Sequence, residues 1–221
     1  AKLIPCLLAW VATIPWLLLV RMEQLPGRRP YRALYLAGLL HWLILIQWVR
    51  LCHWAAHFCW IALVLYLGVY LPVFIWLSRT AVHRLRVPLL VAAPVIWVGL
   101  ECLRGWLLTG FSIALLGHTQ VNWPSIIQIS DLGGAYAVSF VLIFVAAALA
   151  MLIPRRWYEA GGNAPTDAAA TASSWLTASM PAIAAAVLLV GGFVDGHFRL
   201  QATPPGASAE SKRFALVQGS I

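Results

Sequence analysis

Residues 101–120 read ECLRGWLLTGFSIALLGHTQ, and they place a Glu and an Arg at the end of an otherwise apolar segment. Glu101 and Arg104 lie three residues apart, so on a helix they share one face and can neutralise one another. A lone charge is costly inside a bilayer, whereas a pair at the membrane edge is tolerated. Trp106 and Phe111 follow, and aromatic rings of this kind suit the level of the lipid headgroups. The stretch therefore predicts a shaped surface at the point where a membrane helix ends.

The composition of the whole chain indicates an integral membrane protein. Of its 221 residues 62% are hydrophobic and 10% are charged, and its mean hydropathy is +0.85. A soluble domain has roughly 25% charged residues. The formal net charge of +8 could suggest nucleic acid, but the arginines form short clusters between apolar segments and no basic face. Such clusters are typical of loops anchored on the cytoplasmic side, so no nucleic-acid partner is expected.

The apolar segments predict an all-α protein of about six transmembrane helices. The expected spans are residues 3–20, 33–49, 55–78, 88–103, 132–153 and 175–194. Pro5 and Pro15 could kink the first span, and Asp131 is the expected N-cap of the fifth. Residues 105–130 connect two spans, and Pro124 could begin a short surface helix there. The pattern leaves open whether this connection re-enters the membrane or lies at its surface. Residues 1–200 would form the transmembrane domain and residues 201–213 a linker.

The basic residues also predict an orientation. With alternating spans, nine of them lie on one side: Arg21, Arg28, Arg29, Arg32, Arg79, Arg84, Arg86, Arg155 and Arg156. Four lie on the other side: Lys2, Arg50, Arg104 and Arg199. The positive-inside rule makes the first side cytoplasmic, so the 105–130 loop and the C-terminal tail should both face outward.

Candidate reactive residues are few. His53 and His57 stand four residues apart, with Cys52 and Cys59 nearby, so a metal site is conceivable. Without an acidic ligand close by, a pair of interfacial histidines is favoured, and neither a metal nor a cofactor is expected. Cys102 sits between Glu101 and Arg104, but on a helix it points about 100° away from Glu101. We therefore expect Cys102, like the other cysteines, to pack as a small hydrophobic residue.

Two motifs resemble a known bacterial family. Residues 101–111, ECLRGWLLTGF, followed by LGHTQ at 116–120, are similar to the E-x-L-R-G-W-x-x-T-G-F…L-G-[YH]-[ST]-Q signature of apolipoprotein N-acyltransferase. The last residues, 214–221, FALVQGSI, resemble the point where the nitrilase-like domain of that family begins with a strand. Ser112 stands where a Pro is common, and Ser220 where Asn or Asp is usual. The resemblance extends over essentially the whole chain through the layout of its spans.

This resemblance implies a specific activity. Members of the family transfer an acyl chain from a membrane phospholipid to the α-amine of the diacylglyceryl-cysteine that begins a bacterial lipoprotein. A Cys thiolate takes the acyl group as a thioester, a Glu acts as base, and a Lys stabilises the oxyanion. The resemblance places these three residues beyond Ile221, so none is assigned to this chain. It also implies a monomer in the bacterial inner membrane, with its loop 105–130 and tail on the periplasmic or outer side.

The sequence therefore supports two readings. In the first, the chain is the membrane portion of an N-acyltransferase, inactive by itself. Six residues would then line an entrance for lipid or substrate: Glu101, Arg104, Trp106, Phe111, His118 and Gln120. Glu101 and Arg104 could instead form only a structural salt bridge at a helix end. In the second reading, the chain is a non-enzymatic membrane module, either a degenerate relative or a small transporter-like bundle. A transporter would be expected to show internal repeats, and the sequence shows none.

Overall fold

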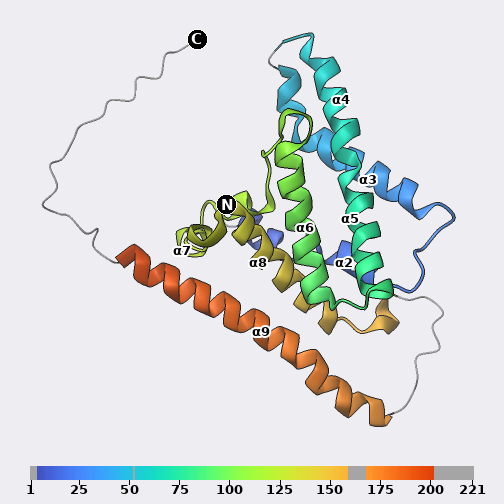
Figure 1. Ribbon diagram of the computed structural model, residues 1–221, viewed down its shortest axis with the longest axis vertical. Coiled ribbons are helices and arrows are strands. Elements are labelled where there is room, and N and C mark those ends of the chain that lie inside the picture. The colour runs from blue at the N-terminus through green and yellow to red at the C-terminus, as the bar shows by residue number, and fades with distance from the viewer. Residues whose placement is uncertain (1–3, 52, 159–167, 202–221) are drawn as a thin grey trace, which may run out of the picture.

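The computed structural model of the protein describes residues 4–51, 53–158 and 168–201, and in these residues the regular structure is helical (Figure 1). The α-helices are α1 (Ile4–Ala9), α2 (Ile14–Arg21), α3 (Pro30–Leu45), α4 (Ala56–Gly68), α5 (Tyr70–Arg79), α6 (Leu89–Trp106), α7 (Pro124–Ile127), α8 (Ser130–Leu152) and α9 (Ala168–Gln201). Short turns of other helix types are η1 (Gln47–Leu51), η2 (Thr80–Arg84), η3 (Leu107–Thr109), η4 (Leu116–Gln120) and η5 (Arg155–Trp157). The predicted strand at 214–221 and the linker after Gln201 lie outside the described residues.

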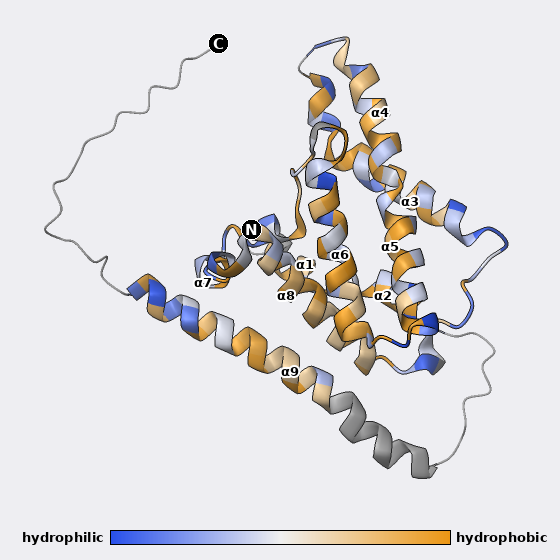
Figure 2. Cartoon of the chain, viewed as in Figure 1, coloured by the Kyte–Doolittle hydropathy of each residue, from blue (hydrophilic) through white to orange (hydrophobic). Residues whose placement is uncertain are grey.

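Four helices in the described part of the chain are long and apolar enough to cross a membrane: Ala56–Arg84, Leu89–Trp106, Ser130–Leu152 and Met180–Gln201. The first of these combines α4, α5 and η2. All four fall on segments that the sequence marks as spans, because each is a long apolar run with few charges. Figure 2 shows the apolar residues along these helices and the hydrophilic residues concentrated near their ends.

The first two expected spans are not confirmed as single long helices. Residues 3–20 contain α1 and α2, separated by a turn at residues 10–13. Pro15 lies at the start of α2, where a ring that lacks an N–H fits the first helical turn. The second segment forms α3, which has 16 residues and passes into the tighter helix η1. Both segments pack against the longer helices.

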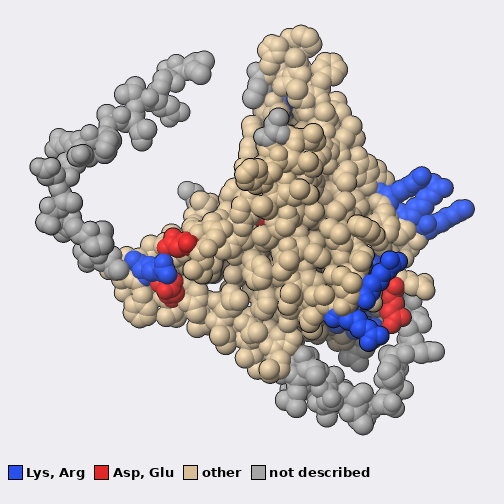
Figure 3. Space-filling view, in the orientation of Figure 1, with Lys and Arg blue, Asp and Glu red and all other residues tan. Residues whose placement is uncertain are grey.

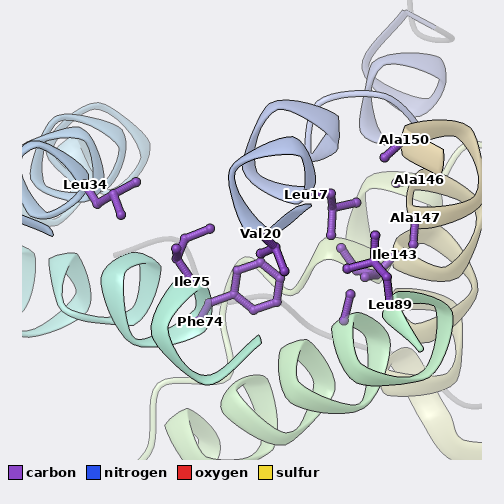
Figure 4. Close-up of a cluster of buried hydrophobic side chains, with 11 residues drawn as sticks. Leu17, Val20, Leu34, Phe74, Ile75, Leu89, Ile143, Ala146, Ala147 and Ala150 are labelled. Atoms are coloured by element: carbon purple, nitrogen blue, oxygen red, sulfur yellow. The ribbon is translucent and has the colours of Figure 1, made fainter. Parts of the chain in front are cut away.

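Small side chains let α8 pack closely at the centre of the molecule. Ala146, Ala147 and Ala150 are fully buried against α2, α5 and α6, together with larger side chains such as Phe74 and Ile143 (Figure 4). The other side of α8 buries Leu142 and Ala148 in a second apolar cluster that reaches α1 and α9. Helix α8 therefore supports the elements on both of its sides.

The start of α8 differs from the sequence prediction. Asp131 is not the N-cap, because the helix begins at Ser130 and Ile129 occupies the capping position. Gly133 and Gly134 then depart from helical geometry, and Gly134 has a φ of 64°. The Asp131 carboxylate instead accepts a hydrogen bond from Nη1 of Arg199 on α9 at 2.7 Å. Asp131 thus joins two helices.

Arginine side chains fasten several helix ends together at one end of the molecule. Arg79 of α5 donates to the carbonyls of Leu19 at 2.8 Å and Met22 at 2.5 Å, at the end of α2. Arg21 of α2 donates to the carbonyls of Ala150 and Ile153, the latter at 2.9 Å, at the end of α8. In Figure 3 the basic side chains gather mainly along one edge of the molecule. The cluster expected from the sequence is therefore brought together by the fold, and it neutralises the carbonyl ends of two helices.

The cysteine prediction is confirmed in part. Cys6 is fully buried, as expected for a small hydrophobic residue. Cys59 and Cys102 are exposed, so the prediction that they pack in the core is wrong. Both lie on helices that are long and apolar enough to cross a membrane. Cys52 lies outside the described residues.

Candidate functional site

A cavity of about 620 Å³ lies between α3, α5 and α6, and it is also lined by residues of the turn at 10–13 and of the segment 114–119. Its wall is mainly apolar, with large side chains such as Trp16, Leu71 and Phe74. Glu101 and Arg104 reach it from the last turns of α6. A mostly apolar cavity with a few convergent polar groups is the usual form of a binding site for a small amphiphilic molecule.

One carboxylate oxygen of Glu101 accepts two hydrogen bonds, and the other accepts none within the described part of the chain. The Glu101 residue is 6% exposed. Oε1 accepts hydrogen bonds from Nε1 of Trp97 at 3.0 Å and from the backbone N–H of Leu116 at 2.8 Å. Oε2 is buried and has no hydrogen-bond partner among the described residues. A buried charge with an unused acceptor reduces the stability of a fold.

Arg104 is held by aromatic rings from two different segments. Its guanidinium lies 4.9 Å from the ring centre of Trp42 on α3 and 5.9 Å from that of Phe111. It also reaches the carbonyls of Ile113 and Ala114, each at 3.4 Å. Cation–π contacts are strongest where the cation is removed from water, and Arg104 is only 5% exposed. Its Nε is buried without a hydrogen-bond partner in the described part of the chain.

Glu101 and Arg104 do not form the salt bridge that the sequence allowed as an alternative. The ion pairs found among the described residues join Arg155 to Glu23 and Arg199 to Asp131 and Asp195. The two charges of α6 share one side of the helix, as the spacing predicts, but each takes its own partners. Each therefore keeps one buried polar atom without a hydrogen-bond partner among the described residues.

The segment at residues 110–120, which we call the strap, is attached to three helices. The backbone N–H of Phe111 donates to the carbonyl of Arg104 at 2.8 Å, and the N–H of Gly117 donates to Oγ of Ser139 on α8 at 2.8 Å. Nε2 of Gln120 donates to the carbonyl of Cys6 on α1 at 3.0 Å. A side chain at position 117 would collide with the carbonyl of Ala135. The glycine therefore lets the strap lie directly on α8.

The six residues predicted to form an entrance occupy different places. Glu101, Arg104 and His118 line the cavity. Phe111 packs on Arg104, while Gln120 is fully buried at the end of the strap. Trp106 is 83% exposed at the end of α6 and does not line the cavity.

Other residues of the cavity were not singled out in the sequence. Thr13, Trp42, Tyr70 and Trp97 also line it. The spacing of Trp97, four residues before Glu101, is a signal that could have identified it, because such residues are neighbours on a helix. No sequence signal connects Trp42 or Thr13 to Arg104, because they are brought together only by the packing of distant segments.

The histidine cluster gains no support as a metal site. In the described residues, no group of three or more His, Cys, Asp or Glu side chains lies close enough to hold a metal ion. Nδ1 of His53 accepts from the backbone N–H of Ala55 at 3.2 Å, and Nδ1 of His57 lies 2.9 Å from the carbonyl of Trp54. Both contacts are local to the turn that begins α4.

Comparison with known proteins gives one consistent family. The family model described as the apolipoprotein N-acyltransferase N-terminal domain matches residues 4–148. The chain is 38% identical to the apolipoprotein N-acyltransferase of Rhodopirellula baltica over 187 residues, which cover 78% of this chain and 32% of the relative. It is 31% identical to that of Geobacter metallireducens over 222 residues, covering 97% of this chain and 39% of the relative.

These relatives are considerably longer than the chain. The matches cover between about a third and two fifths of their length, 32% and 39% respectively. No solved structure matches the chain. The family model nevertheless covers more than half of the sequence, including both charged residues of α6 and the whole strap. The chain belongs to the apolipoprotein N-acyltransferase family.

Proposed function

We propose that the chain is the membrane portion of an enzyme that moves an acyl chain from a phospholipid to the α-amine of diacylglyceryl-cysteine on a lipoprotein. In this proposal the cavity beneath the strap receives the phospholipid. Glu101, Arg104, Phe111 and His118 form its polar end, Trp106 lies at the membrane surface, and Gln120 is buried at the end of the strap. The Cys, Lys and Glu that carry the acyl transfer belong to a nitrilase-like domain after Ile221.

One observation carries this proposal: a cavity with an apolar wall contains two buried charges, each with an unused polar atom. An apolar wall suits an acyl chain, and the two charges suit a polar headgroup. A purely structural pair of charges would be expected to satisfy one another, because unused hydrogen-bonding atoms reduce stability. Membership of the family supports the proposed reaction, and the cavity supports a binding site for its lipid substrate.

The chain would hold the lipid rather than change it chemically. The residues of α6 and the strap would fix the headgroup, so that the ester carbonyl is presented to a thiol outside the membrane. Holding a reactant in one position accounts for a large part of the rate that an enzyme gains. The monomer would lie in the bacterial inner membrane, with its arginine-rich end in the cytoplasm and the strap on the opposite side.

The reading frame beyond codon 221 provides the first test. We expect it to continue into a domain with a Glu, a Lys and a Cys. The full-length product should acylate a diacylglyceryl peptide in phospholipid nanodiscs, whereas the purified 221-residue chain should not. A stop codon directly after Ile221, or a thioester formed on the 221-residue chain alone, would overturn the proposal.

The full-length product also tests the role of the cavity. Arg104→Gln should raise the KM for phospholipid by roughly 10-fold or more, since a hydrogen bond to a charged group contributes about 1.5–3 kcal/mol. Arg50→Gln serves as the control, because Arg50 is exposed on η1 and lies outside the cavity lining. Equal effects of the two substitutions would contradict a lipid site at Arg104.

A further inference from the structure

Thr13 has a buried hydroxyl and is one of the residues that line the cavity. It belongs to the turn between α1 and α2, is 5% exposed, and lines the cavity together with Glu101 and Arg104. Its Oγ1 has no hydrogen-bond partner among the described residues. A buried hydroxyl without a partner reduces the stability of a fold, so its position requires a reason.

The usual structural reason does not apply to this threonine. Thr13 occupies the N-cap position of α2, where a hydroxyl normally accepts a hydrogen bond from the backbone N–H of the second or third helical residue. The second residue here is Pro15, which has no N–H. The structure shows no capping hydrogen bond from the Thr13 side chain, although its backbone carbonyl accepts from the N–H of Leu17 at 3.1 Å.

Three residues that line one cavity therefore each carry a buried polar atom without a hydrogen-bond partner in the described part of the chain. Oε2 of Glu101 can accept a hydrogen bond, Nε–H of Arg104 can donate one, and the hydroxyl of Thr13 can do either. They come from two segments that lie far apart in the sequence. The remaining wall is apolar, so the set fits an amphiphile whose head carries both acceptor oxygens and a donor.

We propose that Thr13 is a specificity-determining residue of the cavity, whose hydroxyl donates to a phosphate or ester oxygen of a bound glycerophospholipid. This inference rests on the proposed function, because it takes the cavity to be the lipid site. The N-terminal turn then contributes to headgroup recognition alongside α6. Its contribution comes from the hydroxyl alone, since the remainder of the Thr13 side chain has the same shape as valine.

The test compares the purified chain with Thr13→Val in a neutral detergent, by thermal unfolding with and without added phosphatidylethanolamine. Without lipid, Thr13→Val should melt at a higher temperature, because an unsatisfied buried hydroxyl has been removed. With lipid, its apparent affinity should be about 5- to 10-fold weaker, because one hydrogen bond to the ligand is lost. A residue with only a structural role would not show these two opposite changes.

Ser78 provides a matched control. It is a second fully buried hydroxyl without a hydrogen-bond partner in the described part of the chain, and it lies on α5 outside the cavity lining. Ser78→Ala should therefore also remove an unused polar atom, but should leave the lipid affinity unchanged.

The measurements distinguish a failure of the role of Thr13 from a failure of the proposed lipid site. If phosphatidylethanolamine stabilises the unsubstituted chain and Thr13→Val equally, the role of Thr13 is overturned while the lipid site stands. If Thr13→Val melts below the unsubstituted chain, its hydroxyl has a structural partner and the inference is likewise overturned. If phosphatidylethanolamine stabilises neither protein, the lipid site itself fails and the inference fails with it.

Discussion

The indole N–H of Trp97 donates to Oε1 of Glu101, one helical turn later on α6, and the same oxygen accepts the backbone N–H of Leu116. One carboxylate oxygen thus connects a membrane helix to the strap across 15 residues of chain. Because Oε1 is occupied from both sides, the other oxygen is fixed in direction. The geometry of the cavity therefore depends on a tryptophan as well as on the acidic residue.

Trp97→Phe should destabilise the protein by about 2 kcal/mol, because it removes a hydrogen bond to a buried carboxylate while keeping an aromatic ring near Phe74. Unfolding in detergent, followed by circular dichroism, measures the change. Trp76→Phe is the control, since the Trp76 residue is 55% exposed on α5. If both substitutions have the same effect, the hydrogen bond to Glu101 contributes nothing specific.

Arg104→Lys should lower the unfolding free energy by about 1–2 kcal/mol. A lysine keeps the charge but loses the flat guanidinium that contacts the rings of Trp42 and Phe111. The same substitution at Arg50, whose guanidinium lies 5.7 Å from the ring centre of Trp60 at an exposed position, should change stability by about 0.5 kcal/mol or less. Denaturation of both variants under identical conditions gives the comparison, and a larger loss at Arg50 would be inconsistent with a buried cation–π site.

Gly117→Ala should destabilise the fold by about 1–3 kcal/mol, because the added methyl group meets the carbonyl of Ala135 and lies 3.1 Å from Cβ of Val138. Gly99→Ala should have the opposite effect on stability. No atom lies within 4 Å of a methyl group placed there, and the position is inside α6, so alanine should stabilise by about 0.5–1 kcal/mol. Melting temperatures that move in the same direction for both variants would refute the close contact between the strap and α8.

The proposed orientation predicts which positions a membrane-impermeant maleimide reaches in intact cells. In a chain with its four cysteines replaced by alanine, Asn122→Cys beside the strap should be labelled. Gln24→Cys, in the arginine-rich segment, should be labelled only after lysis. Both residues are exposed, so accessibility within the protein does not separate them. Labelling of Gln24→Cys alone in intact cells would invert the assignment.

The spans that the sequence predicts well are long, apolar and nearly free of charge. Residues 88–103 and 132–153 were expected, and the structure has helices at Leu89–Trp106 and Ser130–Leu152. Such segments satisfy their own backbone hydrogen bonds, so their helical state depends little on neighbours. The break at residues 10–13 was less predictable, because an apolar run containing Pro5 and Pro15 is compatible with both a kinked helix and two short ones.

The site was predictable only where it is local in sequence. Glu101 and Arg104 share a face of α6, as their spacing requires, and both line the cavity. Their partners were not predictable, because Trp42 reaches Arg104 from a helix more than 60 residues earlier in the chain. The salt bridge between Glu101 and Arg104, which the sequence left open as an alternative, is absent for the same reason. Glu101 instead accepts a hydrogen bond from the backbone N–H of Leu116, and Arg104 donates to backbone carbonyls of the strap.

The arginines at the ends of α2 and α5 also limit how the topology of this protein could be altered. Arg21 and Arg79 belong to the positive cluster that would direct insertion, and their guanidinium groups also close the carbonyl ends of α8 and α2. Neutralising them to reverse the orientation would therefore open two helix ends at the same time. An inverted chain made in this way would lack the contacts that hold the bundle together, so in this protein the insertion signal and the fold cannot be changed independently.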